Sequence, residues 1–270
     1  MKILFIGDIV GRVGRKLVSE LLPAFKKEIG INFCVANGEN AAGGFGITPD
    51  IFYEFRSLGI DVVTSGNHIW DRKEIMELIS QEEHLLRPAN YPSGVPGRGY
   101  NIFPAGENYC VGIINLAGRT YLPIVDCPFR VGAEIVNNVK STTPIIIIDV
   151  HAEATSEKMA LGWYFDGLVS AVVGTHTHVQ TADERILPGG TAYITDIGMT
   201  GPHDSVIGFE KKMAIHRFIT QMPGHFQVAK ENPQFVGVIL DIDPLSGKAT
   251  RIERFRLKGN EEVVNDSNKD

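Results

Sequence analysis

The first eighty residues alternate short apolar runs with longer stretches of helical periodicity. Short apolar runs bounded by turn residues are typical of buried strands, and they occur at 2–6, 32–36 and 62–64. Apolar residues spaced three and four apart predict helices, and these follow the strands at 12–29, 49–58 and 72–80. Thr48 stands where the N-cap of the second helix is expected. This β-α-β-α order predicts an α/β fold with parallel strand pairing.

Later in the chain the pattern includes antiparallel hairpins. Two pairs of apolar runs enclose turn-forming residues, namely 100–103 with 109–116 and 235–242 with 250–257. One further pair, 144–150 and 168–174, encloses a helix near 156–163. Parallel units combined with hairpins predict two sheets packed face to face with helices outside. Because no linker divides the chain, we interpret 1–270 as one domain with a flexible tail at 258–270.

The composition narrows the class of protein. The chain has 270 residues, 43% hydrophobic and 21% charged, which is ordinary for a globular protein. Its net charge is −6 and no stretch is strongly basic, so stable binding to nucleic acid is not evident. A phosphate-bearing substrate would then need a local source of positive charge, and metal ions are the obvious candidate.

The cysteines and the apolar runs indicate where in the cell the protein is expected. Cys34, Cys110 and Cys127 fit neither a disulfide framework nor a zinc motif, so we expect reduced, mostly buried thiols. Asp8 interrupts the N-terminal apolar run too early for a signal peptide. Other apolar runs are far shorter than the roughly 18–20 residues of a membrane span. We therefore expect a cytoplasmic protein that is not bound to a membrane.

Polar residues with ligand chemistry follow five of the predicted strands. The carboxyl ends of strands are where sites form in open α/β sheets, so these residues are expected to converge. They are Asp8, Glu39, Asn40, Asn67, His68, His151, His176 and His178.

Each of these residues also has an ordinary structural explanation. Asp8 could cap a helix, Glu39-Asn40 could be loop polarity, and a single His151 is more often structural than a ligand. His176 and His178 are a more specific indication of metal binding, because residues two apart in an extended segment point to the same side. The joint pattern, with each member at a strand end, is hard to attribute to chance.

The types of ligand constrain the metal. Imidazole, carboxylate and amide oxygen together favour Mn, Fe, Co or Zn over Mg or Ca. The seven residues other than His68 are too many ligands for one small ion. They suit two ions bridged by one carboxylate. Ions about 3.5–4 Å apart clamp a phosphoryl group and activate the water between them. The sequence therefore predicts a dinuclear metal site for phosphate-ester hydrolysis.

The motif order resembles that of the calcineurin-like metallophosphoesterase superfamily, and more specifically the YmdB-like bacterial phosphodiesterases. The stretches NGENAAGGFG at 37–46 and TDIGMTGP at 195–202 look like that subgroup. The superfamily usually opens with Asp-x-His and has Gly-Asp as its second motif. Here Asp8-Ile9-Val10 lacks the histidine and Glu39 replaces the aspartate. Both departures are similar to the YmdB-like pattern, with Asn40 filling the missing coordination position.

The resemblance implies a four-layer α-β-β-α sandwich and a specific division of the ligands. One ion is held by Asp8, Glu39, Asn40 and His178, and the other by Glu39, Asn67, His151 and His176. His68 stays free of metal and protonates the leaving alkoxide. The two ions are divalent or mixed-valence transition metals, iron or manganese. The implied substrates are small nucleotides, notably 2′,3′-cyclic ones, attacked by a metal-activated hydroxide.

Two other functions stay open at this point. One is a phosphomonoesterase, such as a nucleotidase or a protein phosphatase. The other is a non-catalytic regulator that binds metal and nucleotide, although His68 disfavours it because a binding protein needs no leaving-group acid. The oligomeric state is also open, a homo-oligomer included.

Several weaker motifs complete the predictions. The Gly43-Gly44-Phe45-Gly46 stretch is either a mobile substrate loop or a surface turn. Asp71 either orients His68 or caps the helix that follows, and the cap is the preferred interpretation. Weak candidates for facing the site are His203 and Asp204, while His84, His216 and His225 are expected to be structural or on the surface.

Overall fold

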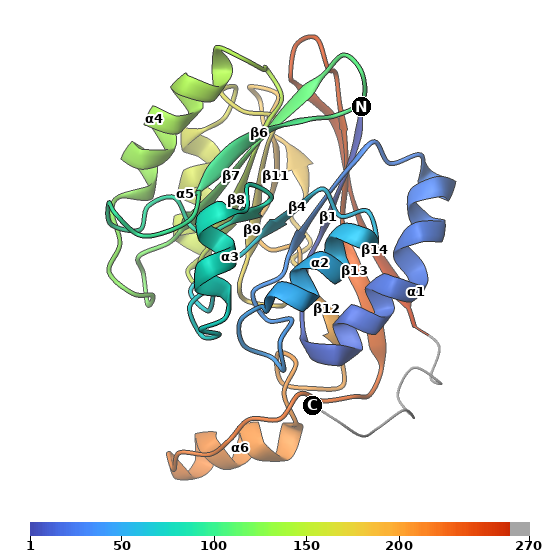
Figure 1. Cartoon of the computed structure of the whole chain (residues 1–270), viewed down its shortest axis with the longest axis vertical. Coiled ribbons are helices and arrows are strands. Elements are labelled where there is room, and N and C mark those ends of the chain that lie inside the picture. Colours follow the sequence, from blue (N-terminus) through green and yellow to red (C-terminus); the bar gives the residue numbers. More distant parts are fainter. Residues whose placement is uncertain (260–270) are drawn as a thin grey trace.

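The computed structural model describes residues 1–259 and shows two β-sheets lying face to face, with helices on both outer sides (Figure 1). This is the four-layer sandwich expected from the sequence. The flexible tail predicted at 258–270 lies mostly outside the described residues. Lys258 is the last residue of a long strand and pairs with Gln234.

The first sheet has eight strands, and the four at one end of its order pair in parallel. Its order is β2-β12-β13-β1-β3-β4-β5, with β14 paired to β13. The strands are β1 Lys2–Ile6, β2 Asp8–Ile9, β3 Phe33–Asn37, β4 Val62–Thr64, β5 Leu85–Leu86, β12 Met199–Pro202, β13 Pro233–Ile242 and β14 Ala249–Lys258. Strands β13 and β14 form the predicted C-terminal hairpin.

The second sheet has six strands in the order β10-β11-β9-β8-β7-β6. They are β6 Tyr100–Pro104, β7 Cys110–Ala117, β8 Ile146–His151, β9 Ala171–Thr175, β10 Arg185–Ile186 and β11 Ala192–Ile194. Strands β6 and β7 form the other predicted hairpin, and β7, β8 and β9 are parallel. Both sheets therefore direct the carboxyl ends of parallel strands to one end of the molecule.

Six helices are present among the described residues. They are α1 Gly11–Ile29, α2 Pro49–Ser57, α3 Ile75–Gln81, α4 Pro128–Lys140, α5 Thr155–Tyr164 and α6 Lys211–Thr220. Helices α1 and α2 lie on one outer side and α4 and α5 on the other, while α6 projects from one end (Figure 1). As expected, Thr48 caps α2 by accepting a hydrogen bond from the Ile51 N–H at 3.5 Å.

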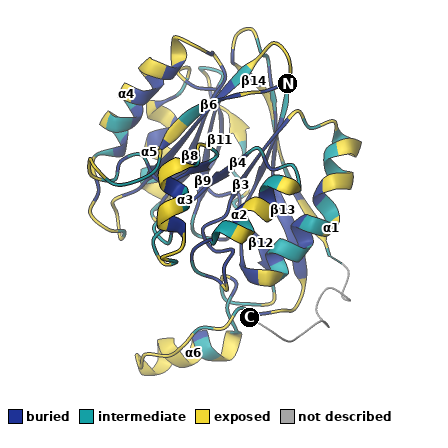
Figure 2. Ribbon diagram, viewed as in Figure 1, coloured by how far each residue is buried: buried dark blue, intermediate teal, exposed yellow. Residues whose placement is uncertain are grey.

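The alternation of side chains along the strands creates three separate cores. Ile3 and Phe5 of β1 join Ile147 of β8 in the core between the sheets. Leu4 and Ile6 point the other way, into a core shared with the helices of the first side. Strands β7 and β8 have a matching outer core with α4 and α5. Figure 2 shows central strands such as β3, β8 and β9 buried and α6 mostly exposed, and β14 at the edge of its sheet is largely exposed.

The structure corrects several predicted boundaries. The third helix begins at Ile75, not at 72, because residues 70–74 form turns. Helices α4 and α6 and strand β12 were not predicted. Helix α4 had a readable sequence signature, since Pro128 stands at its first turn and apolar residues follow at helical spacing. Of the cysteines, which are all free, Cys34 is buried but Cys110 and Cys127 are partly exposed.

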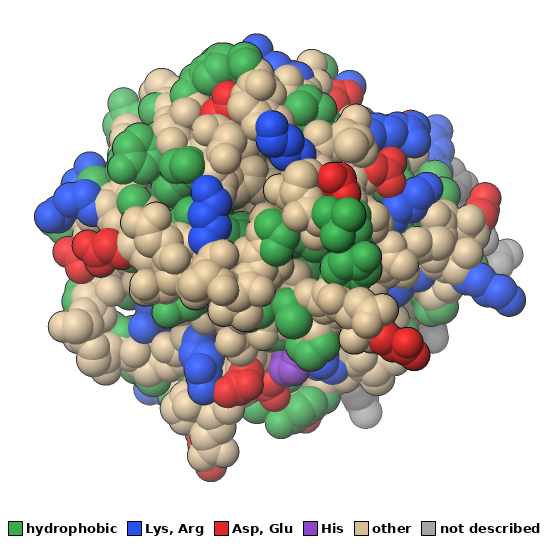
Figure 3. Space-filling model, turned by 90° about the horizontal axis from the view of Figure 1, so that it is seen from above, with side chains coloured by type: hydrophobic (Ala, Val, Ile, Leu, Met, Phe, Trp, Pro, Cys, Tyr) green, Lys and Arg blue, Asp and Glu red, His purple; other side chains and the backbone are tan. Residues whose placement is uncertain are grey.

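The surface agrees with the charge balance of the sequence. On the face in Figure 3, Lys and Arg are interspersed with Asp and Glu, and no continuous basic patch forms there. Within residues 1–259, no helix combines the length and apolar character that a membrane span requires.

Candidate metal centre

The predicted ligands come together between the two sheets, at the carboxyl ends of their strands. Asp8 lies in β2, just past β1, and His151 is the last residue of β8. The others lie in loops: Glu39 and Asn40 after β3, Asn67 after β4, and His176 and His178 after β9. Glu39, His151 and Asp8 are completely buried. Residues from five strand ends thus share one small, solvent-poor region.

The first group of ligand atoms surrounds Glu39. Potential ligand atoms of Glu39, His151 and His176 all lie within 4.8 Å of one another. The Glu39 Oε1 is 3.0 Å from His151 Nε2, and Asn67 Oδ1 is 3.1 Å from the same nitrogen. Two oxygens and two imidazoles at this spacing suit a borderline transition metal.

The second group contains Asp8, Asn40 and His178. His178 Nε2 lies 3.1 Å from Asn40 Nδ2 and 3.7 Å from Asp8 Oδ1. Asn40 Nδ2 also lies 3.3 Å from Glu39 Oε1, which links the two groups. Because the two ends of a carboxamide are nearly the same size, a rotation of the Asn40 amide would present Oδ1 to a cation here. Glu39 is therefore the carboxylate placed to bridge.

Each of the three imidazoles is held by one ring nitrogen. His151 Nδ1 is 3.0 Å from Thr175 Oγ1, and His178 Nδ1 is 2.8 Å from the Ile207 carbonyl oxygen. His176 Nε2 is 3.2 Å from Glu153 Oε2. A hydrogen bond donated by one nitrogen leaves the other with its lone pair free for a metal. The available nitrogens are then Nε2 of His151, Nε2 of His178 and Nδ1 of His176.

Two buried acidic residues that the sequence did not single out as site residues support these histidines. Asp149 accepts hydrogen bonds from Thr175 Oγ1 at 2.7 Å and from Thr64 Oγ1 at 2.6 Å. Burial raises the pKa of Asp149 to about 7. Asp149 therefore holds the Thr175 hydroxyl, and this hydroxyl in turn contacts His151 Nδ1 and fixes the orientation of the imidazole ring. An aspartate inside an apolar strand, between Ile148 and Val150, was the available sequence clue.

The loop that carries His176 and His178 is anchored by Asp196. Asp196 Oδ2 accepts from the Thr177 N–H at 3.0 Å and from its hydroxyl at 2.7 Å. The Lys158 ammonium, 1% exposed, donates to the same oxygen at 2.7 Å. The sequence offered no indication of this lysine, because a Lys in a helix is normally solvated.

The backbone at the two histidines differs from the sequence expectation. The φ angles of His176 and His178 are 96° and 64°, so this segment is not extended. A non-glycine residue in the left-handed region costs roughly 1–2 kcal/mol, and the Asp196 contacts offset that cost. As a result His176 faces Glu39 and His151, whereas His178 faces Asp8 and Asn40.

Gly66 makes room for the ligands. A Cβ atom at this position would lie 2.2 Å from His151 Nε2 and 2.4 Å from Glu39 Oε2. The loop after β4 can approach the cluster only if residue 66 has no side chain. This requirement gives a physical reason for the glycine before Asn67.

The electrostatics of the site call for added positive charge. Burial raises the pKa of Asp8 to about 6, although His178 and His151 oppose the shift. Burial also lowers the pKa of His176 to about 3, which leaves that imidazole neutral. Burial would raise the pKa of Glu39, but the contacts with His151 and His68 together outweigh burial and lower the pKa to about 2. Two buried carboxylates beside the neutral imidazole of His176 are stabilised by cations, so the residues fit a pair of metal ions.

His68 lies beside the ligands without belonging to either group. Its N–H donates to Glu39 Oε2 at 3.1 Å, and its ring Nδ1 is 2.8 Å from Asp71 Oδ2. Asp71 therefore orients His68, and the preferred interpretation as a helix cap was wrong. The cap fails because α3 starts four residues further on, and its N-cap Glu74 makes no side-chain cap bond.

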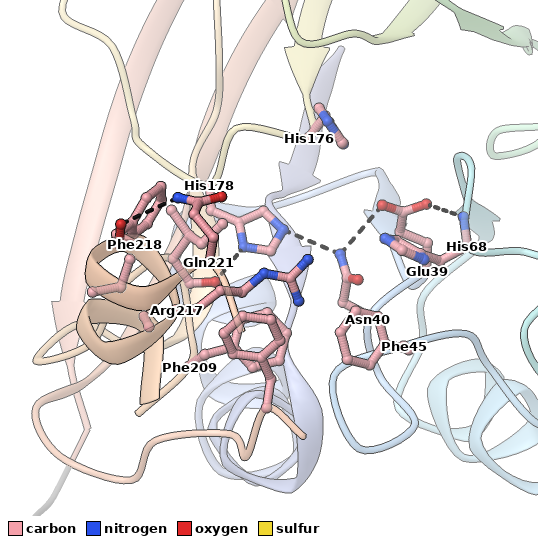
Figure 4. A pocket seen from close by; sticks show the side chains of 14 residues that line it. Glu39, Asn40, Phe45, His68, His176, His178, Phe209, Arg217, Phe218 and Gln221 are labelled. Carbon is pink, nitrogen blue, oxygen red and sulfur yellow. Dashed lines mark hydrogen bonds between the residues drawn. The ribbon is translucent and has the colours of Figure 1, made fainter. Parts of the chain in front are cut away.

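A cavity of about 350 Å³ opens in front of the cluster. Glu39, Asn40, His68, His176 and His178 line one end (Figure 4). Phe45, from the glycine-rich stretch, lies in the wall with its ring 5.1 Å from His68. Arg72 donates to the carbonyl oxygens of Ala42 and Phe45 at 2.6 and 3.1 Å. Phe45 is thus part of the cavity wall, while Gly43, in the turn just before it, is exposed.

The remaining sequence candidates lie elsewhere. His203 and Asp204 do not line this cavity; His203 Nε2 meets the Met199 carbonyl oxygen and Asp204 bonds to Asn232. His84 is structural, with Nδ1 2.8 Å from the Asp61 carbonyl oxygen. His216 and His225 are exposed, as expected.

Comparison with known proteins agrees with this architecture. A protein of Bacillus subtilis named 2′,3′-cyclic-nucleotide 2′-phosphodiesterase is 52% identical over 257 residues, which cover 95% of this chain and 97% of that protein. A crystal structure of a hypothetical protein from Thermus thermophilus has a TM-score of 0.90 and 38% identity, covering 96% of this chain and all of that one. A phosphatase from Mycoplasma pneumoniae has a TM-score of 0.90 and 33% identity, covering 99% and 97%.

The two packed sheets, with their polar strand ends gathered between them, define a calcineurin-like phosphoesterase fold. Within that fold, residues 4–255 match the YmdB-like proteins, and the chain belongs to this family. The family resemblance inferred from the sequence is confirmed.

Proposed function

We propose that this protein is a metal-dependent phosphoric ester hydrolase acting on small nucleotide phosphodiesters, with 2′,3′-cyclic nucleotides as the substrate class. The observation that carries the proposal is the pair of ligand groups sharing Glu39, beside His68, at the end of one cavity. The activity in the name of the Bacillus subtilis relative supports the same class. Three free cysteines support a cytoplasmic location.

The proposed ligands form two sets, one for each ion, which correspond to the two groups of contacts described above. Asp8, Glu39, Asn40 and His178 would hold one ion, and Glu39, Asn67, His151 and His176 the other. Mixed oxygen and imidazole donors suit Mn, Fe, Co or Zn, and the family resemblance implies iron or manganese among these. When bound, such a pair supplies positive charge to the phosphoryl oxygens and lowers the pKa of the attacking water.

The protein's own residues then handle orientation and the leaving group. As the water oxygen attacks phosphorus in a 2′,3′-cyclic nucleotide, the bond from phosphorus to O2′ breaks and the phosphate stays on O3′. The departing O2′ needs a proton, which His68 would donate from Nε2 because Asp71 holds Nδ1. The cavity extends well beyond the ligand groups, which gives room for the nucleoside part of a diester.

The test combines metal analysis with a substrate panel. Protein purified without chelators should contain about two transition-metal ions per chain. It should hydrolyse nucleoside 2′,3′-cyclic phosphates faster than nucleoside monophosphates. One ion or fewer per chain at full activity would contradict the dinuclear arrangement. Tight nucleotide binding with no product after long incubation would instead identify a regulator, and faster monoester hydrolysis would identify a phosphomonoesterase.

A further inference from the structure

One wall of the cavity is lined by aromatic rings. Phe45, Phe209 and Phe226 form a continuous row, with ring centroids 5.1 Å apart for the first pair and 5.2 Å for the second. Phe45 and Phe209 are stacked at 22°, and the other side of Phe45 meets the edge of His68. The aromatic row therefore starts beside the proposed leaving-group acid and runs away from the metal centre.

All three rings are only half-buried and line the cavity. The fully buried phenylalanines of this chain, such as Phe52 and Phe55, lie in the layered cores instead. An aromatic face that borders a concave space offers stacking to a planar ligand, and every nucleobase has such a face. A cavity of about 350 Å³ lies within the size range of small-molecule sites.

The cavity is polar at one end and aromatic further along, so a ligand with one charged and one flat, weakly polar part can bind in only one orientation. The ligand groups and His68 lie at one end, and the phenylalanine row leads away from that end, from Phe45 beside His68 through Phe209 to Phe226. Arg217 reaches from α6 into the cavity, with its guanidinium carbon 5.2 Å from the centre of the Phe226 ring (Figure 4). A nucleotide has the same division, because ribose separates an anionic phosphate from a flat, weakly polar base.

We propose that the phenylalanine row is the nucleobase subsite and that Phe209, at its middle, determines the preference for base-bearing substrates. This inference rests on the proposed function and specifies where the rest of the substrate lies. With the phosphate at the metal centre, the base packs against the rings of Phe45 and Phe209 where they border the cavity. Substrates without a base lose this contact but keep all contacts at the phosphate.

The experiment compares guanosine 2′,3′-cyclic phosphate with methyl riboside 2′,3′-cyclic phosphate, which has the same reacting groups and no base. Wild-type protein should show a kcat/KM about 5- to 100-fold higher for the nucleotide, the range expected for stacking of one base. Phe209→Leu keeps apolar volume but removes the aromatic face. It should lower this ratio several-fold, mainly through KM, and Phe209→Tyr should restore it.

A binding measurement gives a second readout that does not depend on turnover. Calorimetry on metal-loaded protein should show weaker binding of guanosine 3′-monophosphate, the proposed product, to Phe209→Leu than to wild type. Phe129→Leu is the matched control, because Phe129 packs edge-on against Tyr164 in the other outer layer. The control should leave the substrate ratio unchanged.

The outcomes separate the two proposals. Equal kcat/KM for both substrates in the wild type would overturn the base subsite and leave the phosphodiesterase intact. So would equal losses on both substrates in Phe209→Leu, which would show that the ring only holds α6 in place. Failure of the wild type to hydrolyse either compound would overturn the proposed function, and the base subsite with it.

Discussion

The two ends of the cavity are built in different ways. The metal end consists of side chains at the ends of buried strands, and each has at least one fixed partner in the structure. The other end is built from residues 206–226, where α6 buries only Ala214 and Phe218 is 76% exposed. Segments with few buried contacts open at lower free energy than strand cores. The comparison indicates a rigid end for chemistry and an adaptable end for selection.

The strongest test of the rigid end is Glu39→Gln, which keeps the shape but removes the charge shared by both ligand groups. Turnover should fall to about a thousandth or less, because loss of paired ions removes several kcal/mol of transition-state stabilisation. Circular dichroism should show an intact fold. Steady-state rates and metal content measured on one preparation would check this, and wild-type rates would remove Glu39 from the bridging role.

His68→Ala separates acid catalysis from metal binding. A positioned imidazole contributes roughly 10²–10⁴-fold when the leaving group needs a proton, as an alkoxide does. A nitrophenolate leaves without one. The variant should retain both metals and lose far more rate on a nucleotide diester than on a nitrophenyl ester. Equal losses on the two substrates would argue against proton donation, and loss of an ion would make His68 a ligand.

Lys158→Met tests whether the rigid end depends on its buried support. Removing Lys158 leaves the buried Asp196 carboxylate without its cation, which should lower the free energy of unfolding by about 3–5 kcal/mol. Metal affinity should fall about 10- to 100-fold, because Asp196 holds the loop of His176 and His178.

Arg98→Met is the matched control for this variant, since Arg98 and Glu83 form an ion pair of which both members are 54% exposed. It should change the free energy of unfolding by less than about 1 kcal/mol and leave metal affinity unchanged. Denaturant titrations and metal titrations measure both quantities. Similar effects in the two variants would show that the Lys158 contact is no more important than a surface pair.

The smallest effect is expected at the adaptable end. Arg217→Gln removes a guanidinium that faces the centre of the cavity from exposed α6. If Arg217 attracts the phosphate, kcat/KM should fall about tenfold, and equally for base-bearing and base-free substrates. A loss confined to base-bearing substrates would instead assign Arg217 to the base. The salt dependence of kcat/KM should weaken in the variant.

The sequence by itself determined the alternation of strands and helices, both hairpins and the order of the polar strand ends. These features are local: apolar periodicity, turn residues and caps act within a few positions, as at Thr48. Because parallel strands of one layer end together, the same order also indicated which side chains would converge at the metal end. The location of Glu39 between the two ligand groups was implied by the family resemblance.

Only the tertiary structure decided the rest. The turn of His176 and His178 toward different partners depends on Asp196 and Lys158, which are distant in the chain. The role of Asp71 depended on where α3 begins, and sequence periodicity does not resolve such boundaries. The aromatic row joins Phe45 to Phe209 and Phe226 across more than 160 positions. Contacts of this kind leave no local pattern, because the side chains meet only after both sheets have packed.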